Sequence, residues 1–244
     1  MQTLIAPASQ GRADYMRVVE QLSQAFNTTP DNFIRQYKVY DDILKMPQLL
    51  VPNTSYYNFN PVKAVDTPVP GENKIDRNDF FAVTGVGVRF TRATYTSASG
   101  AYSAFGNYPE YTYPYAAVFS GANEATAMQT VVRGLLGLSV NNDQQWALPC
   151  SELVFRQEFI NAQETTIKYG GTDGDRGFKE LNSIVILDGN ADNLLQLNLL
   201  AGVTTNIDGS VTNGTTRNYI MPVLMGIRVK NLAGGGYALQ SCRI

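Results

Sequence analysis

The stretch YIMPVLMGIRVKN, residues 219–231, places apolar residues at every second position. A period of two is typical of a β-strand, whose successive side chains point to opposite faces. Arg228 and Lys230 fall on the opposite face, and we expect Arg228→Ala to matter much less to folding than an Asp placed on the apolar face at Met225 or Ile227. Pro222 has no N–H for a ladder hydrogen bond, which puts the start of the strand at an edge or a bulge. The apolar face comprises Tyr219, Met221, Val223, Met225, Ile227 and Val229.

The stretch DFFAVTGVGVRFT, residues 79–91, predicts a second strand of the same kind. Its apolar positions are expected to share one face, while Gly85 and Gly87 on the other face mark a bend or a close approach of two backbones. The shared face comprises Phe80, Ala82, Val86, Val88 and Phe90.

Seven further segments have strand character, and no strand-helix-strand rhythm connects them. This pattern predicts a mainly β protein, an antiparallel β-sandwich of jelly-roll type. One short helix is expected between strands, capped by Asn123 and closed by Gly137. Its apolar face comprises Met128, Val131, Val132 and Leu135. The further strands are 49–60, 111–119, 137–141, 152–160, 164–169, 182–187 and 194–200.

Residues 11–46 have a helical period and predict two amphipathic helices. Thr29 is a suitable N-cap for the second helix, Pro30 suits its first position, and Pro47 ends it. Residues 1–46 are therefore expected to form an N-terminal helical arm, and residues 47–244 the jelly-roll β-sandwich domain. The helices either cover their own domain or reach a neighbouring subunit. Their apolar stripes are Tyr15, Val18, Val19, Leu22 and Phe26, and then Phe33, Tyr37, Tyr40 and Leu44.

The composition excludes several kinds of site. The chain has 244 residues and no histidine, so it holds no Ser-His-Asp or Cys-His catalytic site. Cys150 and Cys242 are its two cysteines, which allow one disulfide or two buried thiols but no four-cysteine zinc site. Charged residues make up 16%, against about 25% in typical soluble proteins, and the net charge is -2. Such a weakly charged surface favours a protein that assembles.

Short motifs with a catalytic or ligand-binding look have simpler interpretations. TDGDRG at 172–177 and LDGNADN at 187–193 lack the glycine and glutamate positions of a calcium loop, so turns explain them. A glycosidase pair among Glu110, Glu152, Glu158, Glu164 and Glu180 requires a separation that sequence does not give. We therefore expect no enzyme activity, no cofactor and no metal.

Charge and hydropathy also bear on partners and location. Residues 1–46 carry five basic and five acidic side chains, so no basic patch for nucleic acid is expected there. The amino-terminal stretch MQTLIAPASQGRADY lacks the pattern of a secretory signal, and no apolar run approaches the roughly 20 residues of a membrane span. Synthesis in a cytoplasm is expected, while contact with a membrane is left open.

The stretch NYPEYTYPYAAVF, residues 107–119, is rich in tyrosine and is the first candidate for an interface. Tyrosine offers a large contact area and a hydroxyl at low entropic cost, which suits contact between proteins. Aromatic rings also serve as platforms for sugars, so glycan binding is the alternative. The candidate interface residues are Tyr108, Tyr111, Tyr113 and Tyr115, with Val18, Leu22, Phe33 and Tyr37 from the helices.

The order of these segments resembles a jelly-roll capsid protein of a bacterial virus, one of the tailless kind. A helical arm is followed by NDFFAVTGVGVRF, a tyrosine-rich strand, a helix, GLSVNN, SELVFRQEF, SIVILDGNADNLLQLNLL and IMPVLMGIRVKNL. The resemblance covers residues 49–231 as an order of strands and loops. It implies a subunit without catalytic residues that forms trimers or pentamers and tiles a shell.

The expected function is accordingly that of a virion structural protein, a capsid subunit that self-assembles into a shell. Its partners would be copies of itself and other virion proteins, without sequence-specific nucleic acid. Its location would be the virion, after synthesis in the host cytoplasm. The alternative is a receptor- or carbohydrate-binding module of a spike or fibre, in which the tyrosines would meet a glycan.

Overall fold

The protein is described here from a computed structural model. The structure describes residues 9–51, 54–63, 73–94, 110–111, 128–154, 178–199 and 216–231. The helices are α1 (Ser9–Ala25), α2 (Pro30–Gln36) and α4 (Cys150–Leu153), and residues 128–132 are also helical. The strands are β1 (Tyr37–Lys45), β2 (Gln48–Leu49), β3 (Tyr56–Phe59), β4 (Phe80–Thr94), β5 (Glu110–Tyr111), β6 (Leu135–Val140), β7 (Asp143–Pro149), β8 (Lys179–Asp188), β9 (Asn193–Asn198) and β10 (Thr216–Asn231).

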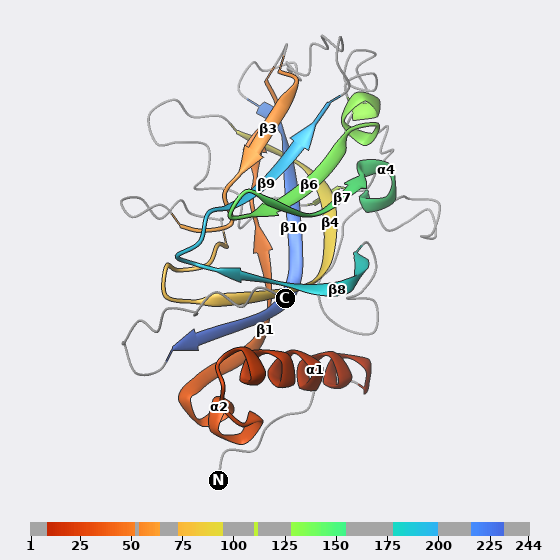
Figure 1. Ribbon diagram of the computed structural model, residues 1–244. Helices are drawn as coiled ribbons and strands as arrows, with labels where there is room; N and C mark the ends of the chain where they lie inside the picture. The colour runs from red at the N-terminus through yellow and green to blue at the C-terminus, as the bar shows by residue number, and fades with distance from the viewer. Residues whose placement is uncertain are drawn as a thin grey trace.

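These strands form two antiparallel sheets (Figure 1). In the first sheet β10 lies between β1 and β4, with β2 also paired to β10, and β4 in turn pairs with β5 and β8. The second sheet has the order β3-β9-β6-β7. The expectation of a mainly β protein with antiparallel sheets and few helices is confirmed.

The two sheets share one apolar core. The first sheet contributes Phe81, Val83, Val86, Val88 and Phe90 from β4, with Ile220 and Leu224 from β10; the second contributes Tyr57, Phe59, Leu136, Leu138, Leu195 and Leu197. Burial of such side chains is the main favourable term in folding, at roughly 25 cal/mol for each Å² of apolar surface. The packing of the two sheets on each other is therefore the main source of stability.

A second, smaller core lies on the other face of the first sheet, beneath α1 and α2. There Val18, Val19 and Leu22 of α1 and Phe33 of α2 pack against sheet residues that include Ile227 and Val229. Figure 1 shows the two helices together at the lower end of the molecule, against these strands. The helices thus cover part of their own domain.

The central strand β10 is buried on both faces. Ile227 and Val229, from the predicted apolar face, contact the helices as expected of core residues. The opposite face is not the polar surface that we expected, because Ile220 and Leu224 lie in the main core. Arg228 on that face is only 2% exposed. A strand that is buried on both faces has apolar residues at successive positions, so its sequence does not alternate between apolar and polar residues.

Strand β4 differs from its predicted single face because it contains a β-bulge. The register shifts between Val83 and Gly85, and the Thr84 hydroxyl donates a hydrogen bond to the carbonyl oxygen of Met225 at 3.3 Å. The extra residue reverses the alternation, so Phe80 and Ala82 face the helices, while Val83 belongs to the main core. Gly85 does mark a bend, as predicted, but the shared face of residues 80–90 was wrong.

The predicted second helix is wrong beyond Gln36. Thr29 caps α2 through its side chain, which accepts a hydrogen bond from the Asn32 N–H, but the chain then becomes extended. Residues Tyr37–Lys45 form β1, which pairs with β10 from Asn231 to Val223. Residues 37–45 are rich in aromatic and β-branched residues, which suit a strand. Pairing with the edge of β10 therefore outweighs the helical spacing of their apolar side chains. This part of the expected arm belongs to the sheet.

Three other boundaries also differ. The inserted helix ends before Gly134, and Leu135 begins β6, so the predicted closure at Gly137 was wrong. Strand β7 was missed. Asn141 and Asn142 form the two-residue hairpin turn that joins it to β6, with the positive φ angles of 51° and 65° that such a turn requires. Residues 150–153 are helical where a strand was predicted from 152, and the predicted strand 49–60 is divided into β2 and β3. The predicted strand 164–169 lies outside the described residues.

Gly226 and Gly137 provide a matched test of the core packing. A methyl group on Gly226 would lie 2.0 Å from the Ala82 carbonyl oxygen, whereas one on Gly137 would meet nothing closer than 3.5 Å. We expect Gly226→Ala to destabilise the protein by about 3 kcal/mol, because two central backbones would have to separate. Gly137→Ala should change the free energy of unfolding by less than about 0.5 kcal/mol. Denaturant unfolding measures both; equal effects would show that the β4–β10 contact is misplaced.

Candidate functional site

The outward side of the second sheet carries no charged strand residue. Leu195 and Leu197 point into the core, so the alternate residues of β9 point outward, and the register places their neighbours beside them. We call this surface the neutral face. Its members are Tyr56 and Asn58 of β3, Leu194, Gln196 and Asn198 of β9, Leu135, Gly137 and Ser139 of β6, and Gln144, Ala147 and Pro149 of β7.

The neutral face combines apolar contact area with amide groups. Tyr56 and Leu135 are 55% and 43% exposed, and both pair with Asn198, so they lie on either side of it. In the next row the Gln196 amide donates a hydrogen bond to the Asn58 side-chain oxygen at 2.8 Å. Exposed apolar side chains next to organised amides are typical of contact surfaces.

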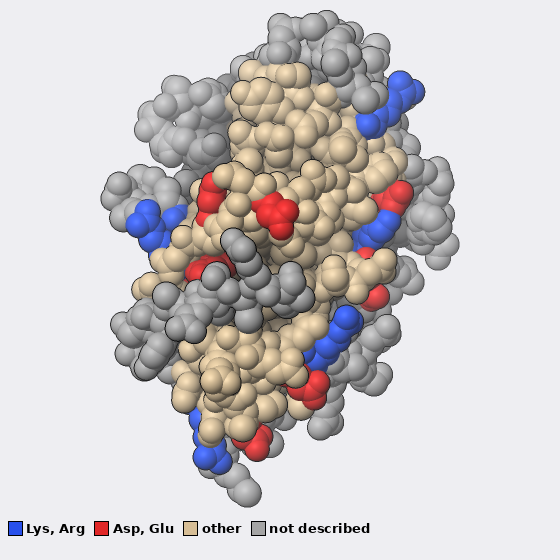
Figure 2. Space-filling model, in the orientation of Figure 1, with Lys and Arg blue, Asp and Glu red and all other residues tan. Residues whose placement is uncertain are grey.

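Figure 2 shows this side of the molecule. The area over β3, β9 and β6 is tan, with red atoms along its lower margin and a blue group at its upper right. Gly137 lies in the middle of β6, and internal packing leaves room there for a methyl group. Its lack of a side chain keeps the centre of the face low, so that another surface can approach closely.

The interface residues predicted on the helices lie elsewhere. Val18, Leu22 and Phe33 are fully buried and Tyr37 is 5% exposed, all in the core beneath α1 and α2. The Phe33 and Tyr37 rings stack with centroids 4.6 Å apart. These side chains are covered by the chain's own sheet, so any contact with a neighbour has to use other residues of the helices.

The predicted tyrosine surface is largely outside the described residues. Tyr108, Tyr113 and Tyr115 lie there, and Tyr111 is described only as part of the backbone of β5 beside Phe90. The tyrosine interface thus stays a prediction.

The neutral face was not predicted, because it becomes visible only when β3, β6, β7 and β9 are placed side by side. Its signal in the sequence was the lack of charge in YYNF, LLGLSV and NLLQLN.

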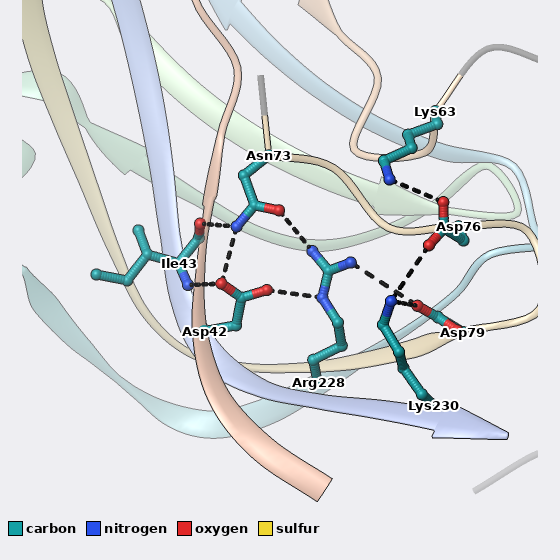
Figure 3. A network of polar contacts seen from close by, with 8 residues as sticks. All are labelled: Asp42, Ile43, Lys63, Asn73, Asp76, Asp79, Arg228 and Lys230. Carbon is teal, nitrogen blue, oxygen red and sulfur yellow. Dashed lines mark hydrogen bonds and ion pairs between the residues drawn. The ribbon is translucent and has the colours of Figure 1, made fainter. Parts of the chain in front are cut away.

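A buried polar network forms the second notable feature (Figure 3). The Arg228 guanidinium lies between two carboxylates, with Nε 2.7 Å from Asp42 Oδ2 and Nη1 3.7 Å from Asp79 Oδ2. The Asp42 contact is an ion pair, since its angle does not suit a hydrogen bond. Arg228 Nη2 also donates a hydrogen bond to Asn73 Oδ1 at 2.9 Å. The earlier expectation that Arg228 matters little is contradicted by these contacts.

The network joins the segment before β4 to the central strands. The Asn73 amide donates to Asp42 Oδ1 at 2.8 Å and to the Ile43 carbonyl oxygen at 2.7 Å. On the solvent side, Lys230 Nζ lies 3.5 Å from Asp76 and 3.7 Å from Asp79. Lys63 Nζ lies 2.9 Å from Asp76. Three carboxylates and three cations thus balance, and the arrangement fixes β1, β10 and residues 73–79 together.

The electrostatics differ between the two outer carboxylates. Burial raises the pKa of Asp79, and the charges of Lys230 and Arg228 offset this only in part. Burial also acts to raise the pKa of Asp76, but the hydrogen bond and charge of Lys63, together with Lys230, lower it overall. The charged form of Asp79 is therefore disfavoured by folding, whereas that of Asp76 is favoured.

Cys150 is a free, buried thiol at the start of α4. Burial raises its pKa to about 12, so the reactive thiolate is scarce at neutral pH. Cys242 lies outside the described residues. Within the described part of the chain, no three acidic or cysteine side chains gather as metal ligands do.

The chain matches no protein-family model, no curated protein and no solved structure. Among the described helices, none combines the length and the hydropathy that crossing a membrane requires.

Removal of the central cation should destabilise the fold. In Arg228→Met the Asp42 carboxylate loses its ion pair at 2.7 Å and Asp79 loses one of its two cations, while both stay mostly buried, and we expect a loss of about 3 kcal/mol. Lys230→Met is the matched control, since its side chain is 37% exposed, and it should cost less than about 1 kcal/mol. Urea unfolding of both variants compares them. A loss in Lys230→Met as large as in Arg228→Met would contradict a central role for Arg228.

The two outer carboxylates should affect the pH dependence of stability in opposite ways. The raised pKa of Asp79 makes stability fall as pH rises above the ordinary value of 3.8. The lowered pKa of Asp76 makes stability fall as pH drops below that value. Asp79→Asn should therefore gain stability more steeply than the wild type between about pH 4 and 6, and Asp76→Asn should lose less below about pH 4. Unfolding curves that shift by the same amount at every pH would refute these assignments.

Proposed function

We propose that the chain is a virion structural protein, a jelly-roll subunit that self-assembles into a shell. The observation that carries the proposal is the strand order. With the two-residue strands β2 and β5 set aside, eight strands pair in a nested way: β1 with β10, β3 with β9, β4 with β8 and β6 with β7. The first strand thus pairs with the last, the second with the seventh, and so inward.

Nested pairing of this kind is what a long antiparallel hairpin gives when it is rolled into two sheets. The outer pairs then join side by side, as β10 does with β4 and β9 with β6. Eight strands in two such sheets define a jelly roll, an architecture found in viral capsids, lectins and cupins. The order supports the jelly-roll interpretation, but fold by itself does not identify a function.

The surface chemistry favours the shell protein among these classes. The chain has no histidine, the commonest metal ligand, and only 16% charged residues. The neutral face offers a broad sheet surface without charge, which needs no desolvation of ions when another protein covers it. Low charge also reduces the repulsion between copies, which assembly at high local concentration requires.

Carbohydrate binding by a spike or fibre module is the second candidate. The 55% exposed Tyr56 ring lies near the amides of Asn58, Gln196 and Asn198, and rings with amides suit neutral sugars. We rank this candidate second because the neutral face is a sheet surface, and the described residues give it no groove.

The test is the state of the purified full chain. We expect multi-subunit particles of uniform size by light scattering and a regular lattice by electron microscopy. Each copy carries a net charge of -2, and salt screens the repulsion between copies. Higher salt should therefore favour assembly. A monomer at every salt and protein concentration tested, together with binding on a glycan array, would replace the shell proposal with the second candidate.

A further inference from the structure

We propose that a second copy of this chain binds to the neutral face, with the two faces stacked across a two-fold axis. The inference rests on the proposed self-assembly and assigns a surface to it. The axis would lie in the plane of the contact and run across the strands, near Gly137. Each β6 would then lie over the β6 of the second copy, in the opposite direction.

The polar groups of the neutral face are suited to a copy of themselves. Asn58, Gln196 and Asn198 are amides, and each amide has both donors and an acceptor. A surface of amides can satisfy itself when it meets its own copy, whereas a surface of one charge repels its copy. The described strand residues of this face include no Lys, Arg, Asp or Glu, so stacking buries no charge.

The charges at the two ends of the face give the stacking its direction. Arg133 is exposed two residues before β6, while Asp143, the first residue of β7, and Asp192, the residue before β9, are exposed near the other end of β6. Strand β6 has six residues, so these ends are about 20 Å apart. Figure 2 shows the same separation of blue and red groups at the margins of the tan area.

A two-fold axis across the strands brings unlike ends together. The Arg133 end of one copy then lies over the Asp143 and Asp192 end of the other, at both ends of the contact. A two-fold axis along the strands would instead place Arg133 over Arg133. Complementary rim charges direct the encounter and suppress the wrong orientation. Glu152 of α4 forms an ion pair with Lys179 at the start of β8, so that pair adds no net charge.

Gly137 fits the position near the axis. It lies in the middle of β6, has no side chain and would face its own counterpart in the second copy. Tyr56 and Leu135 lie one row away, where their exposed apolar area would be covered by the row of Ser139 and Leu194 of the second copy. The opposite side of the molecule differs, because α1 and α2 already cover part of the first sheet there.

Charge reversal tests the orientation in the full chain. Arg133→Glu should raise the protein concentration needed for assembly roughly tenfold, because it places like charges together at both ends. The triple variant Arg133→Glu, Asp143→Lys, Asp192→Lys should restore assembly to within about threefold of the wild type, since reversed ends are again unlike. Arg35→Glu on α2 makes the same charge change away from the face and should have no effect. Light scattering over a dilution series measures assembly, and thermal melting verifies folding.

Disulfide trapping tests the axis independently. In a Cys242→Ser background, Gly137→Cys should form an inter-chain disulfide under mild oxidation, because the two positions meet. Gln36→Cys, exposed at the end of α2, should not. Cys150 is buried and should stay reduced.

The outcomes separate this inference from the proposed function. Wild-type particles with unaffected charge variants and no Gly137 cross-link would overturn the neutral-face contact and leave the shell protein standing. A wild type that never assembles would already refute the shell protein. Loss of neutral-glycan binding in Arg133→Glu or Gly137→Cys, with unchanged assembly, would assign the face to a sugar instead.

Discussion

The burial of β10 on both faces is the constraint on which the other parts of the molecule depend. The strand lies between β1 and β4, with the second sheet over one face and the helices over the other. It nevertheless carries Arg228, whose charge can be buried there only with partners. Asp42 from β1 and Asp79 and Asn73 from the segment before β4 supply them. One arginine thus ties two distant parts of the chain, β1 and the segment before β4, to the central strand.

This arrangement also makes the fold depend on contacts between distant parts of the sequence. Strand β1 and strand β10 lie near opposite ends of the chain, and their pairing closes the first sheet. Such closure requires loop entropy to be lost before contacts compensate for it, so slow and cooperative folding follows. The helices then cover the outer side of the sheet, where Ile227 and Val229 would otherwise be exposed. The helices thus bury an apolar face of the sheet within the same chain.

The sequence predicted those elements whose pattern is local. The strand character of residues 219–231, 182–187 and 194–200 and the Thr29 cap of α2 follow from neighbouring residues, and all are present. It did not predict β1, since Tyr37–Lys45 fits both a helical and an alternating period, and the edge of β10 decides between them. It missed the face reversal in β4, because one bulged residue, Thr84, changes which side every later residue occupies. The neutral face and the Arg228 network join residues far apart in sequence, which periodicity does not detect.

The two notable features lie in different layers of the molecule, so the proposed assembly surface is separate from the parts that hold the fold together. The Arg228 network lies on the inner side of the first sheet, against the main core, while the neutral face is the outer side of the second sheet. A contact through the neutral face, as proposed, would therefore cover side chains whose backbone is already held in β9 and β6, and it would leave the core and the network unchanged. Amides keep such a surface soluble without adding charge that a second copy would repel. With this layering, the proposed assembly would use a face whose side chains the core and the Arg228 network do not need.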